Sequence, residues 1–187
     1  MLAFDKTGPA NTEETLKLAI SAAKERGYDI VFATTRGGTA LRMLELAKEM
    51  GYTGNLVAVT HVYGFMKPGT NTLPEETRKY LNDNGVKTVT AAHALSGAER
   101  GISKVFQGVY PAELMAATLR MLGQGVKVAV EIALMATDNG AVEYGKPVVC
   151  VAGSGSGADT CCIITPSYTA SLLETKVHEI LCKPSLM

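Results

Sequence analysis

Hydrophobic positions along the chain alternate between two periods. Apolar residues at helical spacing predict a helix over residues 11–27, with Asn11 as its start signal and Gly27 as its stop. A short apolar run over residues 29–35 then predicts a buried strand. Helical spacing returns over residues 38–50, and a second apolar run follows at 56–60. The first third of the chain is therefore typical of a strand–helix–strand unit preceded by a helix.

The same alternation continues to the end of the sequence. Helical periods predict helices over residues 74–85, 97–106, 111–122, 131–137 and 172–181, and apolar runs predict strands over 86–90, 126–130, 148–152 and 160–165. This order predicts one domain over residues 1–187, an α/β fold of three layers (α/β/α) with a mostly parallel sheet. The connection over 153–159 is too short for a parallel crossover, so we expect an antiparallel edge strand.

Composition excludes several function classes. The 18 Lys and Arg balance the 18 Asp and Glu, and the sequence shows no basic stripe of the kind that binds the phosphates of nucleic acid. We therefore expect no nucleic-acid partner. No apolar run approaches the ~20 residues that span a bilayer, and no leader pattern opens the sequence, so we expect a soluble, cytoplasmic protein without a membrane partner. We expect Cys150, Cys161, Cys162 and Cys182 to be reduced, small buried side chains rather than redox or metal ligands, and we expect no metal site.

Polar and glycine-rich residues gather where the predicted strands end. In open α/β sheets, ligands bind outside the carboxyl ends of the strands. One candidate loop follows the strand at 29–35 and the other follows the strand at 148–152. Their residues are Thr34, Thr35, Arg36, Gly37, Gly38 and Thr39 in the first loop, and Gly153, Ser154, Gly155, Ser156 and Gly157 in the second.

The first loop has the chemistry of an anion site. Gly37 and Gly38 allow backbone N–H groups to converge, Thr34 and Thr39 add hydroxyls, and the helix that follows presents its positive N-terminus. Arg36 adds a forked cation suited to phosphate. The alternative is structural: Thr39 or Gly38 caps the helix, Gly37 makes a tight turn, and Arg36 is solvated.

The second loop superficially matches a dinucleotide-binding fingerprint, because "AGSGSGADT" reads G-x-G-x-x-A. That fingerprint requires glycines that open a helix, whereas these precede the apolar run at 160–165. We therefore reject the Rossmann interpretation. An anion nest and a flexible hairpin connection both remain open for this loop.

Two histidines and one carboxylate complete the candidates. His61 and His93 follow predicted strands and are candidate catalytic acids or bases, and Glu131, at the predicted start of a helix, is a candidate for binding a ligand hydroxyl or imide N–H. Each also fits a purely structural role. Tyr63 and Phe65 are candidates for covering a flat ring, or for anchoring their own long loop.

Both glycine loops match a known family in order. "IVFATTRGGTALRMLELA" resembles the first effector-loop segment of the pyruvate kinase C-terminal domain, T-x-[ST]-G-x-[ST]-A between a strand and a helix, with Thr34, Gly37, Thr39 and Ala40 in register. "GKPVVCVAGSGSGADTCCII" is similar to the end of that domain. The resemblance implies loops that hold the phosphates of a sugar effector. Arg36 replaces the family's Ser or Thr, and the catalytic barrel is absent, so we expect no pyruvate kinase activity.

The middle of the chain, "THVYGF", "HALSGAERGIS" and "VEIALMATDNGAV", instead resembles stand-alone, uncharacterised proteins of this superfamily. That resemblance covers nearly the whole chain and implies a flavin mononucleotide (FMN) site, with Tyr63, Phe65, His93 and Glu131 beside the phosphate loops. A phosphorylated ligand, with FMN first among candidates, is our expectation, and catalysis stays open. The alternative is a sensor that binds a sugar phosphate and signals through the contacts of a homo-oligomer.

Overall fold

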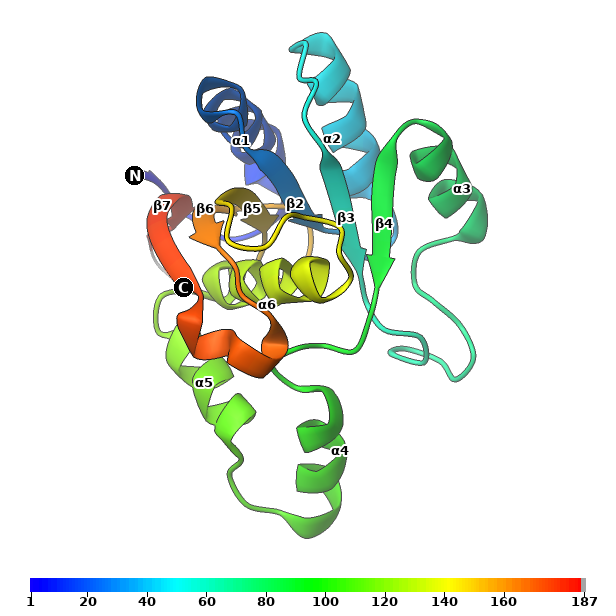
Figure 1. The fold of residues 1–187 in the computed structure, drawn as a ribbon, viewed down its shortest axis with the longest axis vertical. Coiled ribbons are helices and arrows are strands. Elements are labelled where there is room, and N and C mark those ends of the chain that lie inside the picture. Colours follow the sequence, from blue (N-terminus) through cyan, green and yellow to red (C-terminus); the bar gives the residue numbers. More distant parts are fainter. Residues whose placement is uncertain (186–187) are drawn as a thin grey trace.

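The computed structural model describes residues 1–185, in which one sheet lies between two layers of helices (Figure 1). Its strands are β1 (Leu2–Phe4), β2 (Asp29–Ala33), β3 (Leu56–Thr60), β4 (Val86–Thr90), β5 (Val148–Ala152), β6 (Thr160–Thr165) and β7 (Lys176–Pro184). They are ordered β1-β7-β6-β5-β2-β3-β4. Every neighbouring pair is parallel except the two that involve β6. The predicted three-layer α/β fold with a mostly parallel sheet is confirmed.

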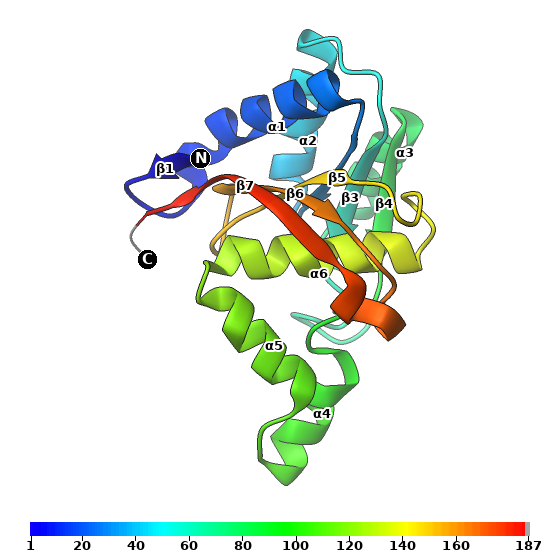
Figure 2. The ribbon, with the colours of Figure 1, turned by 60° about the vertical axis from the view of Figure 1, so that its left-hand side comes forward.

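The helices divide between the two faces of the sheet and a projecting arm (Figure 2). They are α1 (Thr12–Arg26), α2 (Gly38–Glu49), α3 (Glu75–Asp83), α4 (Gly97–Phe106), α5 (Pro111–Arg120) and α6 (Gln124–Asp138), with 3₁₀ turns η1 (Pro9–Asn11) and η2 (Thr169–Glu174). The views show α1, α2 and α3 on one face and α6 on the other. Among residues 1–185, no helix combines the length and apolar character needed to cross a bilayer.

The protein has two hydrophobic cores, one on each face of the sheet, because side chains along each strand point alternately to the two faces. Ile30 and Phe32 of β2 pack among the helices α1 and α2, whereas Val31 between them packs with α6. Successive side chains of a strand point to opposite faces, so a fully apolar strand serves both cores. Cys161 and Cys162 divide in the same way. All four cysteines are buried and free, as predicted, and burial raises the pKa of their thiols.

The predicted strand over residues 126–130 is wrong, because these residues form the first turns of α6. This helix is enclosed by the sheet on one side and α5 on the other, so its apolar positions extend around most of its circumference. A helix of that kind has no clear polar face. A short apolar run cannot distinguish it from a buried strand.

The predicted helix over residues 172–181 is also wrong: η2 ends at Glu174 and β7 begins at Lys176. Strand β6 offers a backbone edge on the side away from β5, and β7 pairs with it antiparallel. This tertiary pairing outweighs a local helical pattern. Because β7 and then β1 lie beyond β6, the antiparallel strand exists as predicted but is not at the edge.

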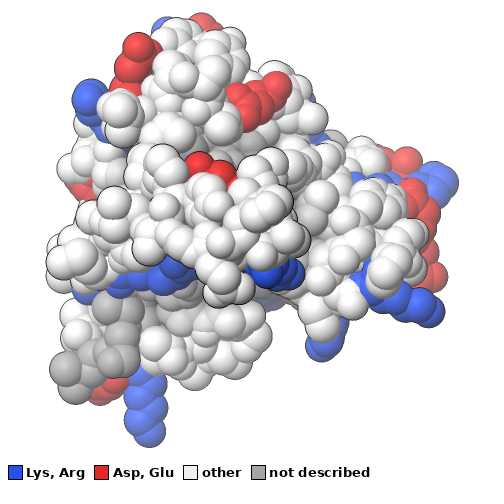
Figure 3. Space-filling model, turned by 90° about the horizontal axis from the view of Figure 1, so that it is seen from below, with Lys and Arg blue, Asp and Glu red and all other residues white. Residues whose placement is uncertain are grey.

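Helices α4 and α5 form an arm, residues 97–120, that projects from the carboxyl-end edge of the sheet (Figures 1 and 2). No residue of α4 is buried, and Val105, Phe106 and Val109 are strongly exposed. Figure 3 views the molecule from this end, where the middle of the face carries few charged side chains. The arm also carries Arg100 and Arg120 to the edge of the sheet where the candidate site lies.

Candidate functional site

Two adjoining cavities open at the carboxyl ends of the central strands. The larger, here called the outer cavity, has a volume of about 710 Å³, within the usual range for sites that bind cofactors and small molecules. It lies between the two glycine loops. Of the predicted binding residues, the structure places Thr34, Thr35, Arg36, Gly38, Thr39, Phe65, Gly153, Gly155, Ser156 and Gly157 on its wall.

Three predicted binding residues do not line either cavity: Gly37, Tyr63 and Ser154. Gly37 has φ +97° before α2, and a Cβ there would lie 2.7 Å from Cγ2 of Thr77. Its small size therefore serves the turn and the packing against α3 rather than space for an anion. Tyr63 is exposed, and the Ser154 hydroxyl donates to Oδ1 of Asp159 at 3.4 Å.

The N-termini of three helices meet the outer cavity. Thr12 begins α1, Gly38 begins α2 and Gln124 begins α6, and each of these residues lies on the cavity wall. All three helices run back from the carboxyl-end edge of the sheet, so their positive ends face the same space. Free N–H groups and helix dipoles of this kind attract anions, and Arg36 adds a full charge.

Among the described residues that line the two cavities, Thr34 has a buried side-chain hydroxyl without a hydrogen-bond partner. Its backbone N–H donates to the Val59 carbonyl at 2.9 Å and so extends the β2–β3 pairing into the loop. Its hydroxyl, Oγ1, is buried and has no hydrogen-bond partner among the described residues. Thr34 lines both cavities. Because buried polar atoms are nearly always paired, this hydroxyl marks a place where a ligand atom would supply the partner.

The second loop is held by a carboxylate that sequence reasoning missed. Asp159 is fully buried, and its Oδ2 accepts the backbone N–H groups of Gly8 at 2.9 Å and Ser154 at 3.2 Å. At Gly153 a Cβ would lie 2.5 Å from the Gly157 carbonyl oxygen, so the loop closes on itself only with glycine there. The loop is therefore a fixed wall rather than a flexible connection.

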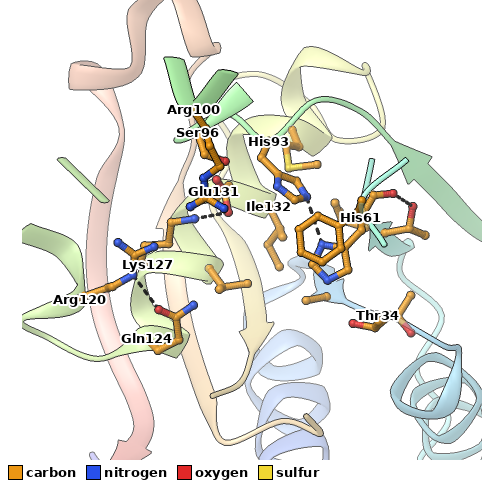
Figure 4. Close-up of a pocket in the computed structure, with 17 residues that line it drawn as sticks. Thr34, His61, His93, Ser96, Arg100, Arg120, Gln124, Lys127, Glu131 and Ile132 are labelled. Atoms are coloured by element: carbon orange, nitrogen blue, oxygen red, sulfur yellow. Dashed lines mark hydrogen bonds and ion pairs between the residues drawn. The ribbon is translucent and has the colours of Figure 1, made fainter. Parts of the chain in front are cut away.

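The smaller, inner cavity has a volume of about 180 Å³ and contains the predicted catalytic candidates (Figure 4). His61 and His93, from the ends of β3 and β4, share a hydrogen bond of 3.1 Å between Nδ1 and Nε2. The Phe65 ring stacks on His61 at 3.9 Å and nearly parallel. Burial lowers the pKa of both histidines, with further lowering of the His61 pKa by His93. Both rings are therefore neutral at neutral pH, and in the bond between them the N–H of one ring donates to the unprotonated nitrogen of the other.

Glu131 lines the inner cavity, but the prediction that it begins a helix after a strand is wrong: it lies within α6. Its Oε2 is ion-paired with Lys127, one turn earlier, and its Oε1 accepts the backbone N–H of Leu95 at 3.0 Å. Both charged side chains are buried, at 5% exposure for Lys127 and 6% for Glu131. Burial lowers the pKa of Lys127, opposed by the Glu131 charge. The carboxylate thus ties α6 to the loop that leads into α4.

Sequence reasoning missed the basic side chains of the inner cavity: Arg100 on α4, Arg120 on α5 and Lys127 on α6. The Lys127–Glu131 spacing was a usable signal, since residues four apart share one helix face. The apolar run at 126–130 conceals this spacing, because it predicts a strand there. Arg100 and Arg120 gave no local signal, because only the arm brings them here. Among residues 1–185, no three His, Cys, Asp or Glu side chains are grouped to hold a metal ion.

Comparison with known families agrees with this architecture. The model of the family described as "Pyruvate kinase, alpha/beta domain" matches residues 13–164. The match runs from the start of α1 to β6 and includes both glycine loops, both histidines of the inner cavity and all of α6. It covers well over half of the sequence. The chain belongs to the pyruvate kinase alpha/beta domain family.

Proposed function

We propose that the protein binds a phosphorylated small molecule in the outer cavity, with FMN as the first candidate. The observation that carries this proposal is the convergence of three helix N-termini, at Thr12, Gly38 and Gln124, on one cavity between two glycine loops. Arg36 supplies a forked cation on the same wall. A phosphate there would accept several backbone N–H groups and one charge-assisted contact.

The other walls of the cavity suit a flavin. The stacked rings of Phe65 and His61 give a flat surface at the junction of the two cavities, and Val128 adds an apolar residue to the lining of both. The unpaired Thr34 hydroxyl would bind a polar atom of the ligand. The residues present therefore fit the group. When bound, FMN supplies one- and two-electron redox chemistry.

The chain's own residues would orient such a ligand and move protons beside it. Neutral His61 and His93 are joined by one N–H···N hydrogen bond, which leaves one unprotonated nitrogen and one N–H free, so the pair can accept a proton at one ring and release one from the other. Glu131 has both oxygens engaged, by Lys127 and Leu95, and is better suited to positioning than to proton transfer. If the protein is a flavoenzyme, substitution of either histidine should reduce turnover while leaving phosphate binding intact.

The visible absorption spectrum of the purified protein tests the proposal, before and after incubation with excess FMN and desalting. We expect a retained flavin band. Arg36→Ala should weaken FMN binding roughly tenfold, because a charge-assisted contact to phosphate is lost. Lys104→Ala is the matched control, since Lys104 is exposed on the arm and lines neither cavity. FMN affinity that is unchanged in Arg36→Ala would place Arg36 outside the phosphate site.

The sugar-phosphate sensor remains the second candidate, because the same phosphate site would serve it. A protein that retains no flavin but is stabilised against heat by sugar phosphates would favour the sensor. Stabilisation by neither class would contradict the phosphate proposal as a whole. The expected homo-oligomer and the cytoplasmic location stay predictions.

A further inference from the structure

The inner cavity is lined by more basic than acidic side chains, and none of these basic side chains lines the outer cavity. Arg100, Arg120 and Lys127 line it against a single carboxylate, Glu131. Figure 4 shows these four side chains together on one side of the cavity, with His61 and His93 on the other and Ile132 between the two groups. Lys127 and Glu131 neutralise each other as a buried pair. Two guanidinium charges remain.

Both guanidinium groups have donors to spare. Arg120 uses its Nε to donate to Oε1 of Gln124 at 2.9 Å, which leaves its two terminal nitrogens. For Arg100, no hydrogen bond or ion pair of the side chain occurs within the described part of the chain. Arginine stays charged at any physiological pH, and its planar fork matches a carboxylate.

The rest of the inner cavity is small and partly apolar. Val59, Val128, Ile132 and Met135 form part of its wall. A volume of about 180 Å³ is below the usual range for sites that bind drug-sized molecules. The space fits a few carbon atoms with a charged group at each end. Inorganic phosphate would leave the apolar wall without a partner.

We propose that the inner cavity is a separate binding site for a small dicarboxylate, held by Arg100 and Arg120 with its carbon chain against Ile132. The two guanidinium charges match two carboxylates, and the apolar wall selects an organic dianion. Such a ligand lies beside the His61–His93 pair, because both histidines line the same cavity. The proposal holds whether the outer cavity takes FMN or a sugar phosphate, since it depends on neither.

The test uses malonate as the probe and the ring signals of the three histidines in a proton–nitrogen NMR titration. Malonate should shift the ring signals of His61 and His93 until they saturate. The ring signals of His178, an exposed residue of β7, should stay unchanged. Arg100→Ala and Arg120→Ala should each weaken malonate binding at least tenfold, whereas Lys104→Ala on the same arm should bind it normally. FMN retention should be unchanged in all three variants, which separates this site from the outer one.

Four results would each overturn the proposal. The first is that Arg100→Ala and Arg120→Ala bind malonate as tightly as the unsubstituted protein does. The second is an affinity for malonamide, the neutral isostere, equal to the affinity for malonate. The third is an affinity for inorganic phosphate as high as that for malonate, measured by the same ring signals of His61 and His93. The fourth is loss of malonate binding in Arg36→Ala but not in Arg100→Ala, which would place the anion in the outer cavity.

Discussion

The outer and inner cavities share the wall formed by Thr34, His61 and Phe65, but they are built from different material. The outer cavity is formed mainly by two loops that directly follow strands and by the first residues of three helices. The inner cavity is formed by charged and aromatic side chains from segments far apart in the sequence. A site of the first kind follows from local sequence, whereas a site of the second kind exists only after the chain has folded.

The two cavities also differ in what stabilises them. The second loop of the outer cavity is held by Asp159, a buried carboxylate that accepts the backbone N–H groups of Gly8 and Ser154. The inner cavity depends on the buried Lys127–Glu131 pair, in which each charge is tolerated only because of the other. Substitution of the buried pair should therefore damage the fold more than substitution of any residue that lines the outer cavity.

The largest expected effect follows from breaking the buried pair. Lys127→Met should lower the free energy of unfolding by about 3 to 5 kcal/mol, because Glu131 is left as an uncompensated buried charge. Chemical denaturation measures the change. Lys79→Met is the matched control: Lys79 pairs with Asp83 at the same spacing but is exposed, and its substitution should leave the free energy of unfolding nearly unchanged.

A double variant checks the cause. Lys127→Met combined with Glu131→Gln removes both charges, and the amide oxygen still accepts the N–H of Leu95. It should recover most of the loss. A double variant as unstable as Lys127→Met alone would show that packing of the Lys127 stem, rather than the buried charge, accounts for the effect.

The difference between the two cavities also explains which parts of the candidate site could be predicted from the sequence. Strand-then-glycine patterns at 34–39 and 153–157 located both loops of the outer cavity, because glycines, hydroxyls and a helix start are local features. The sequence did not show which glycines face the cavity. Gly37 and Gly38 are adjacent, yet only Gly38 lines it; a Cβ at Gly37 would instead meet Thr77 of α3, which is a tertiary neighbour that local sequence does not reveal.

The failures lie where tertiary contacts decide the local structure. An apolar run at 126–130 is compatible with either a buried strand or a buried helix, and only its place between the sheet and α5 selects α6. Residues 176–184 became a strand because β6 had an unpaired edge. The first of these errors also concealed Lys127, whereas Arg100 and Arg120 reach the inner cavity only through the folded arm.

The next largest effect is that of a substitution in the outer cavity, which should raise the stability of the ligand-free protein and lower its affinity for the ligand. Thr34→Val removes a buried hydroxyl that has no partner among the described residues, so the ligand-free protein should gain about 1 kcal/mol in free energy of unfolding. The affinity for FMN should fall roughly tenfold, because the same hydroxyl would bind the ligand. Denaturation without ligand and FMN titration measure the two changes.

Thr12→Val is the control on the same cavity wall. The Thr12 hydroxyl accepts the backbone N–H of Ala158 at 2.9 Å, so its loss should destabilise the ligand-free protein. A destabilised Thr34→Val variant would show that the Thr34 hydroxyl has a partner without ligand, and would remove it from the phosphate site.

The smallest effect is a pH dependence located in the inner cavity. Burial lowers the pKa of His61 and His93 below the ordinary value of about 6.5, so the unfolded chain binds more protons than the folded one just below that pH. The contribution to stability is complete above about pH 6.5 and decreases as the pH falls through that value towards the lowered pKa values. Urea denaturation at about pH 7.5 and 5.5 should show this loss, and His93→Gln should reduce it. His178→Gln, with its exposed ring on β7, should show the same loss as the unsubstituted protein; an equal reduction in both variants would place the pH dependence outside the inner cavity.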